Sequence, residues 1–210
     1  MLTDAAFEGD AEQFDDTPYL NPQDPPSKRQ ILKAALRLFA RQRVETVTVR
    51  QIAEEAGYTN PALFKYFPTK DALALYLFET CYVTLYDRLK KAIDDKSCFN
   101  EQLNALLGVY FSQLERNLDA FLYVQDHLRQ MWPHVALSTR KKSILSLIKK
   151  VLEQGIREGA VARLNPGLLV TALTGTVQQF ARMLCFGEFQ EKPSQWRPEL
   201  EAILRRIMSA

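Results

Sequence analysis

The chain has 210 residues, 47% of them hydrophobic, so it can bury a substantial core and is not disordered throughout. The net charge is only +2, but residues 1–26 carry seven acidic side chains and no basic one, whereas residues 27–70 carry nine Lys or Arg against three Glu. Because no apolar run approaches the roughly 18 residues that span a bilayer, and the start lacks the order of a signal peptide, we expect a cytoplasmic protein.

The first segment, residues 1–26, is rich in Asp, Glu and Pro and shows neither a helical nor a strand period. Such a composition is typical of a flexible acidic tail. From Ser27 onward apolar residues recur every three or four positions, which predicts an all-α fold of about nine helices. After three short helices we expect long helices at 70–94, 99–117, 119–131, 138–158, 166–186 and 195–208.

Residues 27–56 contain two helix-start signals. Ser27 precedes Gln30 by three positions, and Thr48 precedes Gln51 by three. In this capping-box spacing the two side chains satisfy the free backbone N–H groups at a helix start. We therefore expect one helix to begin after Ser27 and a second after Thr48.

A tight turn follows the second helix. Gly57 suits the left-handed geometry of a helix end, Thr59 is placed to cap a third helix, and Pro61 falls in that helix's first turn, where its missing N–H costs nothing. So short a connection between two short helices indicates a helix-turn-helix, the motif that places its second helix in the major groove of DNA.

The third helix, predicted at 60–66, has one face for its own core. Leu63 and Phe67 fit that face at i, i+4 spacing, which leaves Asn60, Phe64 and Lys65 outside. An exposed amide, aromatic ring and lysine suit base edges and phosphates, and the local positive charge favours a polyanionic partner. A purely structural role remains the alternative for each residue taken singly, whereas the conjunction of signals favours double-stranded DNA.

The stretch TVRQIAEEAGYTNPALFKYFPTKDAL resembles the N-terminal signature of the TetR family of bacterial transcriptional regulators, over about residues 28–78. The resemblance implies phosphate contacts by Thr48, Thr59, Tyr66 and Lys70. The chain departs from the family pattern at three positions: Pro61 and Ala62 stand where the family often has Gly and Thr, and Phe64 replaces a common Tyr. Ala62 and Phe64 each remove a hydroxyl group that could bind a phosphate. The candidate DNA-binding residues are Thr48, Arg50, Thr59, Asn60, Pro61, Ala62, Phe64, Lys65, Tyr66 and Lys70.

Residues 99–132 are unusually aromatic, with a few polar side chains interleaved. Aromatic walls of this kind suit a pocket for a small, largely apolar effector, although an ordinary core is an equally simple interpretation of each residue. The candidate ligand-binding residues are Tyr110, Tyr123, His127, Met131, Trp132 and Phe180.

The sequence offers no support for catalysis, a metal or a cofactor. His127 and His134 would lie roughly 10 Å apart even on a continuous helix, too far to share a metal ion. His127 is expected either as a polar group in the pocket or as a partly exposed surface residue. The three cysteines are widely spaced and form no Cys-x-x-Cys pair, which argues against a thiolate zinc site, and neither a catalytic motif nor a phosphate-binding glycine loop is present.

The last two predicted helices each carry an apolar stripe. The stripes either pack within one chain or, as the family resemblance implies, pair with their symmetry mates in a homodimer. A two-fold dimer also suits a DNA reader that must reach two half-sites. The candidate interface residues are Leu169, Leu173, Val177, Phe180, Trp196, Leu200, Ile203 and Ile207.

We therefore expect an acidic tail (1–26), a helix-turn-helix DNA-binding domain (27–74) and a helical ligand-binding and dimerisation domain (75–210). The function predicted is a dimeric, ligand-responsive transcriptional regulator that binds a palindromic operator as a repressor, with no membrane partner. The alternative on the same fold is an architectural or protein-partner role, in which no small molecule controls DNA binding. Independently of this choice, the acidic tail is either a solvated extension or a segment that competes with DNA for the basic face.

Overall fold

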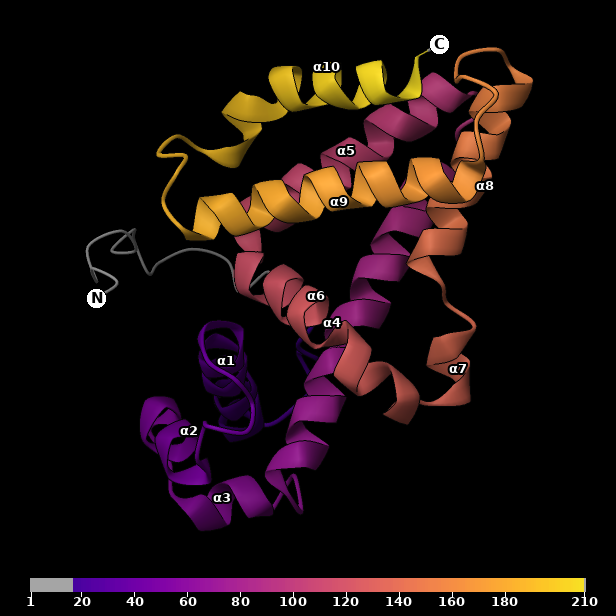
Figure 1. The fold of residues 1–210 in the computed structure, drawn as a ribbon. Coiled ribbons are helices and arrows are strands. Elements are labelled where there is room, and N and C mark those ends of the chain that lie inside the picture. Colours follow the sequence, from indigo (N-terminus) through magenta and orange to yellow (C-terminus); the bar gives the residue numbers. More distant parts are fainter. Residues whose placement is uncertain (1–16, 210) are drawn as a thin grey trace.

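The computed structural model describes residues 17–209, and this part of the chain is helical without any strand, as predicted (Figure 1). Three short helices form the end drawn at the bottom left: α1 (Pro26–Arg41), α2 (Val49–Ala56) and α3 (Asn60–Phe64). The long helix α4 (Lys70–Ile93) rises from them into the bundle. The remaining helices are α5 (Phe99–Arg116), α6 (Leu118–Met131), η2 (Trp132–His134), α7 (Leu137–Arg140), α8 (Ile144–Arg157), α9 (Pro166–Cys185), η3 (Pro193–Trp196) and α10 (Arg197–Met208).

The first helix starts differently from the prediction. α1 begins at Pro26, whose fixed φ suits a first helical turn, and Ser27 makes no capping hydrogen bond. The Ser27 hydroxyl instead lies 2.6 Å from the hydroxyl of Tyr66. Ser27 therefore joins α1 to the end of the third helix.

The segment before α1 is also not a free tail in its described part. Leu20 is only 8% exposed and packs with the residues under α1 and α4, and the hydroxyl of Thr84 donates to the carbonyl of Pro18 at 3.3 Å. The prediction of a flexible tail is thus wrong for this part, because Leu20 has apolar surface to bury. Residues 1–16 lie outside the described residues.

The buried residues form two hydrophobic cores. The reader core lies between α1, α2, α3, the first half of α4 and one side of α6, and it includes Phe39, Ile52 and Leu63. The bundle core lies between the second half of α4 and α5, α6, α8, α9 and α10. α4 belongs to both: Leu77 is in the reader core and Leu89 in the bundle core. One unbroken helix therefore links the two regions.

The helix predicted at 138–158 is broken. Residues 141–143 separate α7 from α8, and the Ser143 hydroxyl accepts a hydrogen bond from the Ser146 N–H at 3.1 Å, so a new helix starts there. The helix predicted at 195–208 likewise divides into η3 and α10. Across residues 17–209, no helix combines the length and apolarity that a membrane crossing requires.

Candidate DNA-binding surface and effector cavity

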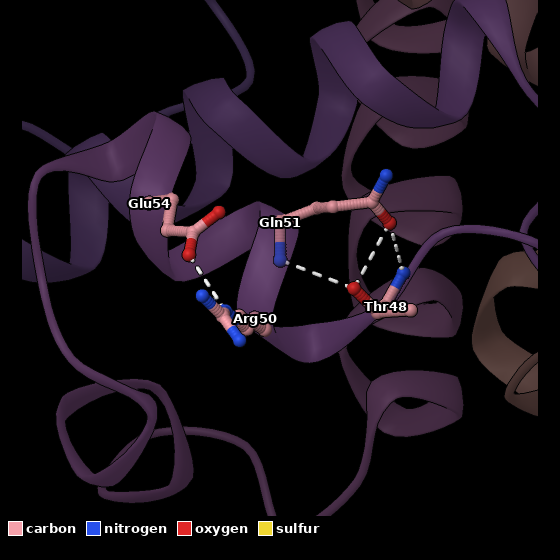
Figure 2. Close-up of polar contacts among 4 residues, drawn as sticks. All are labelled: Thr48, Arg50, Gln51 and Glu54. Atoms are coloured by element: carbon pink, nitrogen blue, oxygen red, sulfur yellow. Dashed lines mark hydrogen bonds and ion pairs between the residues drawn. The ribbon is translucent and has the colours of Figure 1, made fainter.

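The start of α2 carries the predicted capping box (Figure 2). The Thr48 hydroxyl accepts a hydrogen bond from the Gln51 N–H at 3.2 Å, and the Gln51 carbonyl oxygen Oε1 accepts one from the Thr48 N–H at 2.8 Å. Each side chain thereby satisfies the free backbone N–H of the other residue. This prediction is confirmed, and the box fixes where α2 begins relative to the turn.

Arg50 lies in the first turn of α2 and is highly exposed. Its Nε is 2.7 Å from Oε1 of Glu54, one turn further along the helix (Figure 2). The hydrogen bond to Glu54 raises the pKa of Arg50, which keeps the guanidinium charged. This pair uses Nε and leaves the terminal amino groups to approach a phosphate.

The third helix presents the face expected of it. Leu63 and Phe67 are buried, and Asn60, Phe64 and Lys65 are exposed, with 48% of Phe64 accessible. Pro61 is exposed as well, in the first turn, and Ala62 is half-buried. The helix is shorter than predicted, ending at Phe64 rather than 66. The outward face therefore combines an amide and a lysine with apolar groups.

Two predicted phosphate contacts keep their hydroxyl groups at the surface of the reader. Thr59 is the residue before α3, as predicted, but its hydroxyl makes no capping hydrogen bond to the helix. Tyr66 is half-buried, its hydroxyl lies beside Ser27, and the ammonium of Lys65 lies 5.7 Å from its ring centre. A hydroxyl can donate and accept at once, so Tyr66 retains the capacity for a phosphate contact.

Lys70 has a different role from the predicted one. Its ammonium donates to the backbone carbonyls of Val44 at 2.6 Å, Val47 at 2.7 Å and Glu45 at 3.1 Å. An ammonium has three N–H donors, and these three carbonyls use them all. Lys70 therefore braces the loop before α2 instead of presenting a free donor to DNA.

A cavity of about 690 Å³ lies inside the bundle, between α4, α5, α6, α8 and α9. Its wall is mainly aliphatic and aromatic, which matches the composition of sites for small apolar molecules. Tyr110 and Tyr82 contribute phenol rings, and burial raises the pKa of both, so they stay neutral. The main apolar residues of the wall are Leu85, Leu89, Leu103, Leu106, Leu107, Phe121, Val124, Leu128, Trp132, Ile144, Ile148, Leu173, Val177 and Leu204.

Of the six predicted ligand residues, Tyr110 and Trp132 line this cavity and four do not. Tyr123 and Met131 are buried in the reader core, and the Tyr123 hydroxyl donates to the Ala74 carbonyl at 2.8 Å. His127 is 9% exposed, bonded to the Tyr123 carbonyl at 3.0 Å, so it is neither a cavity nor a surface residue. Phe180 packs against Phe111 and Phe189 in the bundle core. α6 is apolar on two faces, one toward the cavity and one toward the reader core. The predicted residues of α6 lie on the face toward the reader core.

The contribution of α4 to the cavity was not predicted from the sequence. Tyr82, Leu85 and Leu89 of this helix line the wall. Their i, i+3, i+7 spacing marks one helical face, but it does not distinguish a cavity wall from an ordinary core.

Comparison with known proteins agrees with this geometry. Residues 31–77 match the family model described as bacterial regulatory proteins, tetR family. These residues carry the DNA-binding domain of the TetR family. The chain is a helix-turn-helix DNA-binding regulator of transcription, and residues 31–77 cover most of α1, all of α2 and α3, and the first turns of α4.

Known relatives are similar to this chain over most of its length. The fatty acid metabolism regulator protein of Bacillus subtilis is 25% identical over 83% of this chain and 85% of that protein. The nucleoid occlusion factor SlmA of Shewanella oneidensis is 26% identical over 80% of this chain and 87% of that protein. These relatives are named as regulators and DNA-associated factors rather than as enzymes.

Solved structures share the fold. The ketosteroid transcriptional regulator KstR2 of Mycobacterium tuberculosis superposes with a TM-score of 0.76 at 22% identity, covering 89% of this chain and 96% of that one. The transcriptional regulator FadR of Bacillus subtilis, in complex with stearoyl-CoA, has a TM-score of 0.65 at 19% identity, covering 86% and 99%. The fold of most of the chain, including the bundle, is therefore shared with these regulators.

The apolar stripes predicted to form the dimer interface are largely turned inward. Leu169, Leu173, Phe180 and Leu200 are buried in the bundle core. Val177, Trp196 and Ile207 are half-buried against the same core, and only Ile203, at 50%, is clearly exposed. The stripes cover the bundle of their own chain, as the simpler interpretation held.

A different face of the same helices is exposed. Leu168 is 71% exposed, and Ala172, Gly175 and Gln179 follow it at helical spacing along the outer side of α9. On α10 the exposed apolar residue is Ile203. Small side chains on such a face allow close approach of a second helix pair. Any pairing through these helices would use this face.

Proposed function

We propose that this TetR-family chain is a ligand-responsive repressor, which binds a palindromic operator as a homodimer and is released by a small, largely apolar effector. One observation carries the proposal: α4 is part of the reader core at its first half and part of the cavity wall at its second half. A molecule in the cavity therefore bears directly on the helix that positions the reader.

Tyr82 is the point where the two regions of α4 meet. Its ring stacks on Phe78 at 6.0 Å in the reader core and meets the ring of Trp132 edge-on at 5.0 Å. Both Tyr82 and Trp132 line the cavity, and the Tyr82 hydroxyl accepts a hydrogen bond from the Ile144 N–H at 3.2 Å. An effector that displaces either ring shifts α4, and with it α3.

The energy required for such a switch is within reach of an apolar ligand. Changing the ratio of the two conformations by about 10⁴ needs roughly 5.5 kcal/mol of differential binding. At about 25 cal/mol per Å² this corresponds to roughly 220 Å² of apolar surface buried in one state and not in the other. A ligand that fits only one arrangement of α4 meets this requirement.

A homodimer supplies the second α3 helix that a two-part operator requires. Operators are read at two half-sites about 34 Å apart, which one short α3 cannot span. The exposed face defined by Leu168, Ala172, Gly175 and Ile203 is the surface that we assign to dimerisation. The candidate phosphate and base contacts on α2 and α3 remain as predicted, except for Lys70.

The relatives support an apolar effector. One solved relative is described as a ketosteroid regulator and another as bound to stearoyl-CoA. The alternative, a DNA-binding protein with an architectural or partner role, draws support from the nucleoid occlusion factors at 24–26% identity. The cavity of about 690 Å³ favours the sensor, because a role without a ligand needs no such volume.

Selection of genomic DNA with the purified protein tests the first part. We expect recovered fragments to share an inverted repeat whose half-site centres lie one helical turn apart, and absence of any repeat contradicts operator binding.

Leu106→Trp, which puts an indole into the cavity, tests the switch. We expect it to weaken operator binding about tenfold, while Leu164→Trp, at an exposed loop position outside the cavity wall, leaves binding unchanged. Equal affinities for both variants would favour the architectural alternative.

A further inference from the structure

The polarity of the cavity wall changes steadily along one side of α6. Phe121, Gln125 and Arg129 follow one another at i, i+4 and i+8, so they share one helical face, and all three line the cavity. Phe121 is buried, Gln125 is half-buried and Arg129 is exposed. The cavity thus has an apolar interior and a cationic mouth.

Arg129 has no protein partner among residues 17–209: neither a hydrogen bond nor an ion pair involves its guanidinium. The side-chain amides of Gln125 and Gln178, which also line the cavity, likewise make no hydrogen bond within residues 17–209. An exposed guanidinium at the mouth of an apolar cavity is free to pair with the anionic group of a ligand that enters the cavity.

The carboxylates near this mouth are already engaged. Asp126, three residues before Arg129, pairs with Arg182 at 2.9 Å. Asp87 on α4 pairs with Lys142 at 2.8 Å, next to the wall residue Ser143. No acidic side chain is among the residues that line the cavity. The positive charge of Arg129 is therefore not neutralised by the protein itself.

We propose that the effector is an amphipathic anion, whose charged group is bound by Arg129 and whose apolar part extends into the cavity toward Leu107 and Leu204. The planar guanidinium pairs with a carboxylate or a phosphate through two parallel N–H donors, and Gln125 can add a third donor from the same helix face. The inner end, lined by leucines that are buried, offers no partner for a second charge. This inference rests on the proposed effector site and specifies its ligand class.

The test uses three probes that share one chain: laurate, lauroyl-CoA and dodecanol. Binding is followed by the fluorescence of Trp132, which lines the cavity, whereas the second tryptophan, Trp196, does not. We expect laurate, lauroyl-CoA or both to bind about tenfold more tightly than dodecanol, since a charge-assisted hydrogen bond contributes roughly that factor. Preference for laurate indicates a free carboxylate, and preference for lauroyl-CoA indicates the phosphates of a carrier.

Arg129→Gln should remove this preference and leave the affinity for dodecanol unchanged. The matched control is Arg157→Gln, which removes an exposed arginine at the far end of α8 and away from the cavity wall. Equal binding of anionic and neutral probes by the wild type, or a preference that survives Arg129→Gln, overturns the inference while leaving the effector site intact. If neither these probes nor the neutral dye Nile red binds in the cavity, both the proposed effector site and this inference are disproved.

Discussion

The reader core and the bundle core use the same residue types but fill space to different extents. In the reader core Ile31, Ile52 and Leu63 have no exposed surface, and Phe39 has 1%. In the bundle core leucines of comparable burial surround a cavity of about 690 Å³. A surface that must match the shape of DNA requires a fixed backbone, whereas a ligand site requires volume that the chain itself leaves empty.

The largest expected effect comes from removing a ring in the reader core. Phe39→Ala deletes a buried ring that stacks on Tyr123 at 5.9 Å, and we expect a loss of about 3–5 kcal/mol in the free energy of unfolding. Leu106→Ala, at a half-buried position on the cavity wall, should cost only about 1 kcal/mol because its side chain already faces empty volume. Urea denaturation measures both. Similar losses would mean that the two cores are equally well packed.

Two lysines of the reader separate stability from DNA binding. Lys70→Met leaves the part-buried carbonyls of Val44 and Val47 without their donor, so we expect a loss of about 1–3 kcal/mol in the free energy of unfolding and an unchanged salt dependence of DNA binding. Lys65→Ala should instead leave stability unchanged and lower the slope of log K against log salt by about 1. Thermal melts measure the stability of the two variants, and salt titrations measure the salt dependence of their DNA binding. A fall in the salt slope for Lys70→Met would restore it as a phosphate contact.

The exposed amide of α3 should affect specificity more than affinity. Asn60→Ala removes the exposed amide at the start of α3, and we expect it to narrow the difference in binding free energy between operator and random DNA by about 1–3 kcal/mol. Competition binding with both DNAs at fixed salt gives the ratio. An unchanged ratio would show that Asn60 does not read a base.

The smallest effect concerns a carboxyl group between the two regions. Asp119 lies in the first turn of α6, and burial raises its pKa, opposed by the positive charges of Arg41 and Arg37 on α1. A raised pKa in the folded state means that the folded protein holds this proton more tightly than the unfolded chain, so stability falls as pH rises through the pKa. Asp119→Asn should therefore stabilise the protein at neutral pH, with a gain that vanishes in acid below both pKa values. A gain that persists at low pH would contradict a titration effect.

The reader could be predicted from sequence because its signals are local. The capping box of Thr48 and Gln51, the left-handed end at Gly57 (φ 72°) and the outward position of Phe64 each depend on a few neighbouring residues. The ends of α4 were predicted for the same reason. Ser27 is the instructive failure, since its spacing matched a cap but Tyr66, distant in sequence, took its hydroxyl.

The bundle could be predicted only as helices. Tyr123 and Trp132 lie in one aromatic segment, yet the former fills the reader core and the latter lines the cavity. Hydrophobic pattern shows that a side chain is buried, but it does not show whether the other side of the contact is protein or empty volume. Leu169 and Leu200 were predicted at a dimer interface but lie in the bundle core for the same reason. The hydrophobic pattern identifies an apolar face but not the surface that it packs against.

The continuity of α4 through both cores also constrains how the two regions can be recombined. In an α-helix each residue adds about 100° of rotation, so one residue inserted between Leu77 and Tyr82 would swing the reader around the helix axis relative to the bundle. A chimera that grafts this reader onto another bundle therefore has to preserve helical phase at the junction. Seven inserted residues, close to two full turns, would lengthen the connection while nearly restoring the original orientation.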